Sequence, residues 1–446
     1  MAHVLGYKCS LCGAEYGLDQ VEYVCARHGD AGNLDIVLDY AAIREAESPA
    51  RIADSRDFSI WRYASLLPVG DAVERSEMRR EEPGFAGTPM RSVGWTPLYR
   101  ADRMVAPLGL RNVWLKDDGR NPTASFKDRA SAVAVARALE LGREVITTAS
   151  SGNAGAALAG MAAAAGLSSV IMVPHNAPQA KVAQLLIYGA TVLLVNGSYD
   201  DAFDLNLAAA REFGWYCRST GYNPFTLEGK KTAAFEICEQ LAEVGGRESQ
   251  VGGQRSEVGW EAPDRIFVAV GDGNIISGIH KGLKDLLALG WIEKMPKLMG
   301  VQAEGAAAVY HAWRTGTETI RAVEAKTLAD SIAVGLPRDG VRALRAARET
   351  GGAYLTVSDD EILAAMLDLA RGQAVFAEPA AATAWAGLVK AAHENMAAAD
   401  ERIVVVITGS GLKDVRAAMQ AAGEAMTIEP RLDEVRRVMQ LSSAGR

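Results

Sequence analysis

Six short apolar runs, rich in β-branched residues, constrain the fold of this chain more than any other feature. They are Glu144–Thr148, Ser169–Val173, Thr191–Val195, Arg265–Val270, Lys297–Gln302 and Arg402–Thr408. Segments rich in alanine and leucine at helical spacing lie between them, such as Ser131–Leu141 and Ile279–Leu289. Strands that are apolar on both faces belong in parallel sheets covered by helices on both sides. The pattern therefore predicts an α/β fold with helices on each face of the sheet.

The length and the charge of the chain limit its organisation and its partners. A chain of 446 residues is long enough for two or three domains. Its 47 basic and 55 acidic residues give a net charge of −8 without a basic tract, which argues against nucleic acid or a membrane surface as a partner. No uncharged apolar stretch reaches the roughly 18 residues of a membrane span.

The beginning of the chain and its cysteines indicate the compartment. Met1–Gly6 lacks the basic start and the apolar run of an export signal. Five cysteines are an odd number, and three of them fall within the first 25 residues, which argues against a disulfide framework. We therefore expect a cytoplasmic protein.

Two segments interrupt the alternation of strands and helices. Gly245–Pro263 is rich in glycine, serine and charge, and we expect a surface loop there. Thr315–Thr350 mixes charged helix with Gly335–Pro337, which we expect to form a loop near the substrate entrance.

The string Asn121–Arg129 is the most informative one for function. Pro122 and the small residues after it predict a turn, and Ala130–Leu141 predicts a helix. Lys127 would then lie at the helix N-terminus, where the positive end of the dipole disfavours its ammonium form. Only a neutral amine attacks an aldehyde, so a lysine with a lowered pKa suits imine chemistry. The alternative is a solvated surface lysine.

Three glycine-containing loops each follow a predicted strand. Ser150–Asn153 precedes the predicted helix Ala154–Ala165 and would bind a substrate carboxylate, while Asn153 could hydrogen-bond a phenolic oxygen of a cofactor. Gly271–Ile275 also precedes a helix and would bind a phosphate. In Thr408–Lys413, a neutral hydroxyl would suit an unprotonated pyridine nitrogen. Taken singly, each loop could be a tight turn or a helix cap.

In this order, the four motifs resemble those of fold-type II enzymes that use pyridoxal 5'-phosphate (PLP), and most of all those of the threonine synthase family. The resemblance extends from about Thr96 to Met419. Smaller matches are Gly94–Leu98, Asn223–Pro224, Leu227–Gly229, Val301–Gln302, Glu304–Gly305 and Glu378–Pro379.

The resemblance implies a fold like that of the tryptophan synthase β subunit, in which two parallel-sheet domains enclose the active site. We expect residues 36–130 and 216–446 to form the larger domain that binds PLP, and residues 131–215 the smaller one. The resemblance also implies a homodimer and a small amino acid as substrate.

The resemblance assigns roles to individual residues. Lys127 would carry PLP on its amine and move the substrate proton, Asn153 would contact the PLP hydroxyl, and Thr408 the ring nitrogen. The cofactor phosphate would lie on Gly271, Asp272, Gly273, Asn274 and Ile275, and the substrate on Ser150, Ser151, Gly152 and Asn153. Glu378 could lie near the ring or have a structural role, and we favour the structural role.

The chain departs from the family pattern on the side of the substrate phosphate. The positions are Ala154 where threonine is usual, Thr220–Gly221 in place of an Asn-Ser pair, Thr226 in place of an arginine, and Ser410 in place of a histidine. Thr226 can offer a phosphate one neutral hydrogen bond, whereas an arginine binds it through two charge-assisted ones. Lys181, Lys230, Lys231 or Arg338 could substitute for that arginine.

Three functions are compatible with these residues. The chain could convert O-phospho-L-homoserine and water to L-threonine and phosphate, with a phosphate clamp built from other residues. It could instead be a paralogue that performs β-elimination or β-replacement, like a threonine or serine dehydratase or a cysteate synthase. A non-catalytic regulator with a PLP-enzyme fold is the third possibility.

The first 35 residues carry the spacing of a zinc ribbon. Cys9 and Cys12 form one pair, Cys25 and His28 form a second, and 12 residues separate the two pairs. Three cysteines and one histidine are a closed structural zinc set, so we expect a structural role for the ion. Several chains similar to threonine synthase also begin with a short cysteine-rich ribbon. The alternative is a group of surface cysteines without metal.

Overall fold

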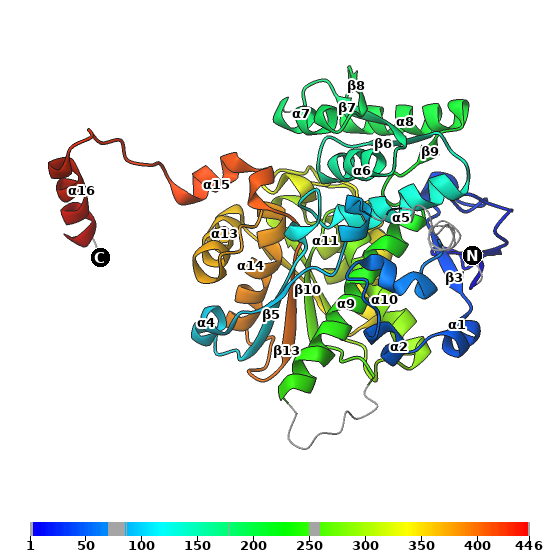
Figure 1. Ribbon diagram of the computed structural model, residues 1–446, viewed down its shortest axis with the longest axis horizontal. Coiled ribbons are helices and arrows are strands. Elements are labelled where there is room, and N and C mark those ends of the chain that lie inside the picture. Colours follow the sequence, from blue (N-terminus) through cyan, green and yellow to red (C-terminus); the bar gives the residue numbers. More distant parts are fainter. Residues whose placement is uncertain (1–2, 70–84, 86, 178, 249–258, 445–446) are drawn as a thin grey trace.

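The computed structural model describes residues 3–69, 85, 87–177, 179–248 and 259–444, and it contains three sheets (Figure 1). The largest sheet has six strands in the order β12-β11-β10-β13-β5-β4. Their bounds are β4 Leu98–Arg100, β5 Asn112–Asp117, β10 Arg265–Ala269, β11 Lys297–Ala303, β12 Ala353–Val357 and β13 Arg402–Ile407. All pairs in this sheet are parallel except the edge pair of β4 and β5. The parallel core of the α/β prediction is confirmed.

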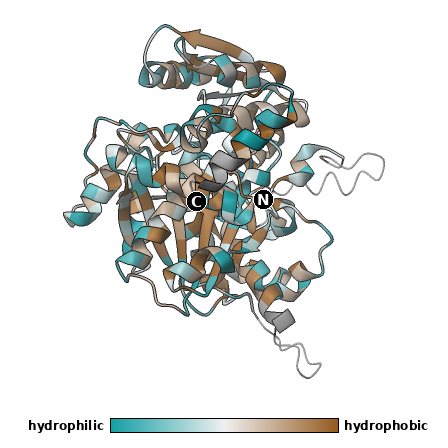
Figure 2. Cartoon of the chain, turned by 90° about the vertical axis from the view of Figure 1, so that its left-hand side faces the viewer, coloured by the Kyte–Doolittle hydropathy of each residue, from teal (hydrophilic) through white to brown (hydrophobic). Residues whose placement is uncertain are grey.

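Alternation along the strands of this sheet divides the core into two layers. Ile266 and Val268 of β10 pack in one hydrophobic core with helices α9 and α10, while Phe267 and Ala269 pack in a second core with α13 and α14. Because neighbouring side chains point to opposite faces of a strand, a continuous apolar run covers both faces. Figure 2 accordingly shows these strands as predominantly hydrophobic. The helices of this part are α9 Phe225–Glu248, α10 Asn274–Leu289, α11 Ala308–Arg314, α12 Gly340–Glu349, α13 Asp359–Gln373, α14 Pro379–His393 and α15 Val415–Ala422, with the short α4 Asp102–Val105.

The second sheet has four parallel strands in the order β8-β7-β6-β9. Its strands are β6 Val145–Ala149, β7 Ser168–Pro174, β8 Thr191–Val195 and β9 Tyr216–Cys217, and its helices are α6 Asn153–Ala164, α7 Gln179–Ile187 and α8 Tyr199–Phe213. Helix α8 packs on one face and α6 on the other. Helix α5, Lys127–Glu140, packs against both α6 and α9 and so connects the two parallel-sheet units.

The N-terminal residues form a small antiparallel sheet, β2-β1-β3, with bounds β1 Val4–Cys9, β2 Glu15–Tyr16 and β3 Leu34–Leu38. Two short helices follow, α1 Tyr40–Ala46 and α2 Pro49–Ala53. At the other terminus, α16 Leu432–Ala444 lies apart from the sheets (Figure 1). Among the described residues, no helix combines the length and the apolar character needed to cross a membrane.

Two expected boundaries shift in the structure. The small antiparallel sheet continues to Leu38, and β9 pairs with β6, so both extend past the boundaries expected at residues 35 and 215. The division into domains itself stays a prediction. The loop expected over Gly245–Pro263 begins as helix, because α9 continues to Glu248, and residues 249–258 of it lie outside the described residues.

Candidate active site

The four predicted motifs come together at the carboxyl ends of the strands. Ser150–Asn153 follows β6, Gly271–Ile275 follows β10, and Thr408 follows β13 directly. Ligands of open α/β sheets bind at this edge, because the loops that leave parallel strands meet there. The lysine loop after β5 joins them through backbone hydrogen bonds, from Phe126 N to Thr408 O at 2.8 Å and from Ser410 N to Ala124 O at 3.1 Å.

A buried ion-pair network fixes the first turn of α5. Arg129 donates from Nε to Asp118 Oδ2 at 2.6 Å and from Nη1 to Glu236 Oε1 at 2.5 Å, and Lys116 Nζ lies 2.7 Å from Glu236 Oε2. All four side chains are buried, so the charges are paired in a medium where unpaired ones would be costly. Because Arg129 lies two residues after Lys127, this network positions the reactive lysine. Sequence reasoning missed it, because its acids lie far from the lysine motif along the chain.

Lys127 is the first residue of α5, three residues before the expected helix start. Burial lowers the pKa of its amine, Arg218 lowers it further, and the charge of Glu378 opposes this shift. The direction agrees with the prediction from the lysine motif. Its largest cause, however, is removal from water, rather than the position on the helix.

Asn153 and Glu378 meet across the site. Asn153 Nδ2 donates to the Glu378 carboxylate at 2.8 Å and 3.1 Å, and both side chains are buried. Burial raises the pKa of the Glu378 carboxyl, and the hydrogen bond from Asn153 and the charge of Lys127 oppose that shift. A Cβ at Gly409 would lie 2.3 Å from Glu378 Oε1, so the glycine of the Thr408 loop lets this carboxylate approach. Glu378 therefore belongs to the site, and its role toward the ring stays a prediction.

The glycine loop after β10 leaves the start of α10 open. No side chain caps this helix, and Gly273 precedes it with a φ of +91°. A Cβ added at Gly273 would lie 2.6 Å from Ala343 Cβ, and a Cβ added at Gly271 would lie 2.8 Å from Ile332 Cα. Helices α8 and α13, by contrast, begin with serine capping boxes that bond their free N–H groups. An uncapped helix start beside a glycine turn is suited to bind an anion.

The residues of the site fit PLP. Besides the lysine amine and the open start of α10, the buried hydroxyl of Ser125 has no hydrogen-bond partner among the described residues. Lys230 also reaches this loop, where its Nζ lies 2.5 Å from Asn274 Oδ1. Lys127 would hold the cofactor aldehyde, Gly271–Ile275 its phosphate, and Thr408, which is buried at the end of β13, its ring nitrogen. These roles stay predictions.

The Ser150–Asn153 loop borders a cleft of about 120 Å³. Ser151, Gly152 and Asn153 line it together with Glu378 and Lys413. Helix α6 begins at Asn153 without a side-chain cap, because its N-cap residue is Gly152; the nearby Ser150 Oγ accepts from Gly152 N at 3.2 Å. The arrangement leaves backbone N–H groups free for a carboxylate.

Two of the residues at the departures from the family pattern, Thr226 and Ser410, make local hydrogen bonds. Thr226 is buried and donates its hydroxyl proton to Asn223 O at 2.7 Å, so it has no proton left to offer a phosphate. This corrects the expectation that Thr226 supplies one hydrogen bond. Ser410 Oγ accepts from Leu412 N at 3.4 Å, in agreement with the alternative role of a helix cap.

Of the four cations considered as substitutes for the missing arginine, three have acidic partners. Lys181 contacts Asp330, Arg338 Nη2 lies 2.6 Å from Asp200 Oδ1, and Lys231 Nζ lies 2.5 Å from Glu228 Oε2 and 2.9 Å from Asp285 Oδ2. Lys230 is bonded to a neutral amide. The structure adds a cation that sequence reasoning missed, Arg218, which is fully buried. Its signal was a charged residue directly after a strand, but β9 has only two residues and was not recognised.

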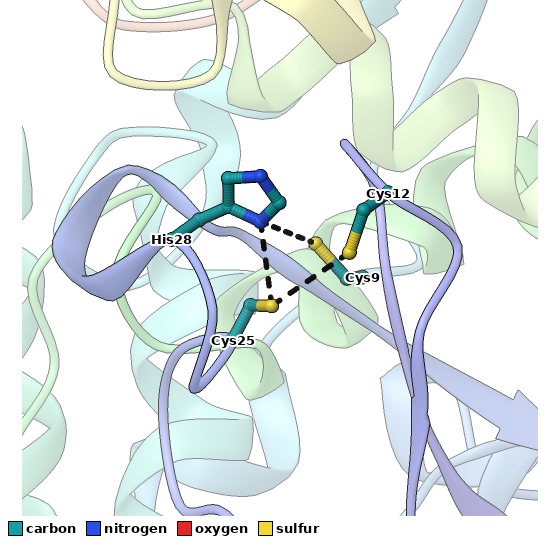
Figure 3. Close-up of side chains that lie close together, drawn as sticks. All are labelled: Cys9, Cys12, Cys25 and His28. Carbon is teal, nitrogen blue, oxygen red and sulfur yellow. Dashed lines mark hydrogen bonds between the residues drawn. The ribbon is translucent and has the colours of Figure 1, made fainter.

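Cys9, Cys12, Cys25 and His28 lie together at the predicted zinc ribbon (Figure 3). Their ligand atoms are all within 4.8 Å of one another; Cys12 Sγ is 3.9 Å from Cys25 Sγ, and His28 Nδ1 is 3.5 Å from Cys25 Sγ. Tetrahedral zinc with bonds of about 2.3 Å to sulfur separates two sulfur atoms by about 3.8 Å. The geometry and the donor set therefore fit zinc.

The N-terminal segment also braces the site. Tyr23 accepts a hydrogen bond from Cys217 N at 3.1 Å and stacks on Tyr222 with ring centroids 4.9 Å apart. These two contacts precede and follow Arg218 in the sequence. Asn33 donates to Arg338 O at 3.0 Å and to Asp339 Oδ1 at 3.1 Å. The ribbon thus contacts the segment from Cys217 to Tyr222, which carries Arg218, and the Arg338–Asp339 loop.

The fold and the site define an enzyme that uses PLP, and comparison with known proteins agrees. Residues 90–409 match the model of the pyridoxal-phosphate dependent enzyme family, and the chain belongs to that family. Among curated relatives, it is similar to threonine synthase of Methanocaldococcus jannaschii, with 37% identity over 97% of this chain and 98% of the relative. Threonine synthase of Methanosarcina acetivorans is also 37% identical, over 96% and 97%. Threonine synthase of Mycobacterium tuberculosis is 34% identical over 80% and 89%.

Solved structures share the fold. Threonine deaminase isoform 2 of Solanum lycopersicum superimposes with a TM-score of 0.60 at 21% identity, over 80% of this chain and 96% of that one. Diaminopropionate ammonia lyase of Escherichia coli gives a TM-score of 0.62 at 19% identity, over 83% and 93%. At these identities the likeness concerns the fold alone, and it confirms the expected fold-type II architecture.

Proposed function

We propose that this chain converts O-phospho-L-homoserine and water to L-threonine and phosphate. The observation that carries the proposal is the similarity to relatives named threonine synthase over nearly the whole chain, at 37% identity. Lys127, the open start of α10 and the uncapped start of α6 lie around one site, as this reaction requires.

Different residues of the site would have different roles in this reaction. PLP, when bound, withdraws electrons from the α-carbon of an attached amino acid and so makes its proton removable. Burial keeps Lys127 in its neutral form more readily than in water, so its amine can take that proton and return it. The N–H groups at the start of α6 would orient the substrate carboxylate. Asn153, whose side chain is held by Glu378, would contact the cofactor hydroxyl.

An assay of the PLP-loaded enzyme tests this function. We expect equal amounts of threonine and phosphate from O-phosphohomoserine. Turnover of serine, threonine or phosphoserine, with O-phosphohomoserine inert, would favour a β-eliminating or β-replacing paralogue. A purified protein that is colourless and takes up no PLP would favour the non-catalytic regulator.

We also propose that the four N-terminal ligands hold one structural zinc ion. Support comes from three thiols and an imidazole at tetrahedral spacing, a set that leaves no open coordination position. Elemental analysis should find one equivalent of zinc, and Cys9→Ser should lose it together with thermal stability. Less than about half an equivalent, with Cys9→Ser as stable as the parent, would reject the site.

We further infer a homodimer in the cytoplasm, with a small amino acid as its substrate and neither nucleic acid nor membrane as partner. All five cysteines are free thiols, which suits a reducing compartment. Light scattering on the purified protein tests the dimer, and a monomeric mass would reject it.

A further inference from the structure

Arg218 is a buried cation that has no acidic partner within the part of the chain that the structure describes. Its side chain is fully buried, and its Nε and Nη1 donate to two neutral hydroxyls, Ser131 Oγ at 3.1 Å and Thr220 Oγ1 at 3.0 Å. Its Nη2 has no hydrogen-bond partner, and no carboxylate pairs with it, among the residues that the structure describes. An unpaired charge in the interior is costly, so an anion bound at Nη2 would stabilise it.

The guanidinium packs against the helix that carries the reactive lysine. Ser131 follows Lys127 by four residues on α5, and residues at this spacing share one face of a helix. Because Ser131 Oγ accepts from Arg218 Nε, the guanidinium lies against the face of α5 that carries Lys127. In agreement, the charge of Arg218 lowers the pKa of both Lys127 and Lys230.

Three carboxylates whose charges act on these cations accept hydrogen bonds from other donors. Asp128 accepts from Thr123 N at 2.6 Å, Asp272 accepts from Arg338 N at 3.2 Å, and Glu378 accepts from Asn153. Lys127, Arg218 and Lys230 therefore face the site without an ion pair between them and these acids. Burial also lowers the pKa of Arg218 to about 10, a sign that its charge is poorly solvated. Such a site favours a ligand with two negative charges.

Lys230 and Arg218 lie at the edges of different sheets. Lys230 is bonded to Asn274 in the glycine loop at the edge of the larger sheet, where the cofactor phosphate is expected. Arg218 follows β9 at the edge of the smaller sheet. A guanidinium binds two oxygens of one phosphate through parallel N–H groups, which a lysine cannot do.

We propose that Arg218, held by Ser131 and Thr220, binds the phosphate group of the substrate and replaces the family arginine whose place Thr226 occupies. This inference rests on the proposed function, since it assumes a substrate with a phosphomonoester. The other source of the same chemistry, the phosphate of PLP, is separated from it by the experiment below.

The test measures two affinities in the same variants. The PLP-loaded enzyme is titrated with inorganic phosphate, and the cofactor-free enzyme is titrated with PLP by its near-visible absorbance. Arg218→Gln should weaken binding of inorganic phosphate by on the order of 10- to 100-fold, with a comparable rise in KM for O-phosphohomoserine. Its affinity for PLP should stay within about threefold of the parent. The phosphate affinity of Arg218→Lys should lie between those of the parent and Arg218→Gln, because lysine keeps the positive charge but lacks the paired N–H groups of the guanidinium.

Arg103→Gln is the control. This arginine lies on α4 of the larger sheet unit, is exposed and donates to the backbone oxygen of Gly372 at 3.1 Å, so both affinities should equal those of the parent. If Arg218→Gln does not fold, Ser131→Ala provides the second variant. It leaves the guanidinium in place without its Nε partner and should weaken phosphate binding by about 3- to 10-fold.

Three outcomes would overturn the inference. Unchanged binding of inorganic phosphate in Arg218→Gln would remove Arg218 from any phosphate site. A loss confined to PLP affinity would assign Arg218 to the cofactor phosphate. A loss in Arg338→Gln in place of Arg218→Gln would assign the site to the other arginine.

The same data distinguish failure of the inference from failure of the proposed function. A parent enzyme that forms threonine, with KM unchanged in Arg218→Gln, would keep the function and reject the subsite. A parent that binds inorganic phosphate through Arg218 but does not turn over O-phosphohomoserine would keep the subsite and reject the function.

Discussion

The cofactor side of the site and its substrate side use different parts of the chain to face a phosphate group. The cofactor side uses backbone: the uncapped start of α10 and the glycines at 271 and 273, within five consecutive residues. The substrate side uses side chains: Arg218 after β9, supported by Ser131 on α5 and Thr220. Backbone N–H groups in a turn are determined locally, whereas a buried arginine depends on partners brought together by folding.

The two sides also differ in what supports them. Around the cofactor side, the support is the core of the larger sheet and the Arg129 network. Around the substrate side, the support includes the N-terminal segment, through Tyr23 on Cys217 and Asn33 on the Arg338–Asp339 loop. A change on one side should therefore alter the affinity for one phosphate group more than the affinity for the other.

The largest effect is expected from Lys127→Ala, which removes the amine on which both the cofactor and the substrate proton depend. Turnover should fall by about 10³-fold or more, because the group that moves the α-proton is lost. Steady-state assay measures the loss, and circular dichroism with thermal melting checks that the fold survives. Activity near that of the parent would overturn the assignment of Lys127 on either side of the site.

Gly273→Ala should break the cofactor side alone. The φ of +91° disfavours alanine, and its Cβ would lie 2.6 Å from Ala343 Cβ, so the loop must shift. We expect PLP affinity to fall by on the order of 10- to 100-fold, measured by absorbance titration of the cofactor-free enzyme.

Gly290→Ala is its control at the other end of α10. That glycine also has a positive φ, +74°, but a Cβ there meets no atom within 4 Å. It should lower stability slightly and leave PLP affinity unchanged. Equal losses of PLP affinity in the two variants would show that backbone strain, and not the phosphate loop, is responsible.

Removal of metal from the N-terminal ligands should affect the substrate side more than the cofactor side. A chelator, or Cys12→Ser, loosens the segment that holds Tyr23 and Asn33 against the substrate side. The affinity of the PLP-loaded enzyme for inorganic phosphate should fall by about 2- to 30-fold, while PLP affinity changes less. If PLP affinity fell as far as phosphate affinity, the segment would brace the site as a whole.

The smallest effect is expected from Glu378→Gln, through the protonation of Lys127. The Glu378 charge holds the pKa of Lys127 up against burial, so its removal should lower that pKa further. The amine binds the PLP aldehyde only when neutral, and with a lower pKa it is neutral at lower pH. The acidic limb of PLP binding should therefore move to lower pH, as measured by titration across pH. A shift to higher pH would contradict the electrostatic role of Glu378.

Much of the fold and half of the site followed from local patterns. The run Thr191–Val195 became β8 with the same bounds, and the motifs after the strands lie at one edge because parallel strands place their carboxyl ends together. The spacing of Cys9, Cys12, Cys25 and His28 anticipated their meeting, since two short loops are enough to bring two pairs of ligands together. In each case the information lies within a few residues of chain.

Residues that depend on distant partners were not predictable in this way. The hydroxyl of Thr226 is used by Asn223, and Lys181, Lys231 and Arg338 are each paired with an acid, which no spacing in the chain announced. Arg218 is distinguished only by the absence of such a partner among the described residues, and the acids of the Arg129 network come from separate segments. The sequence by itself determined the parallel α/β fold, the lysine and the cofactor loops, because periodicity and turn chemistry are local. Only the tertiary structure decided which buried charges are compensated, because the energy of a buried charge depends on every group that folding places around it.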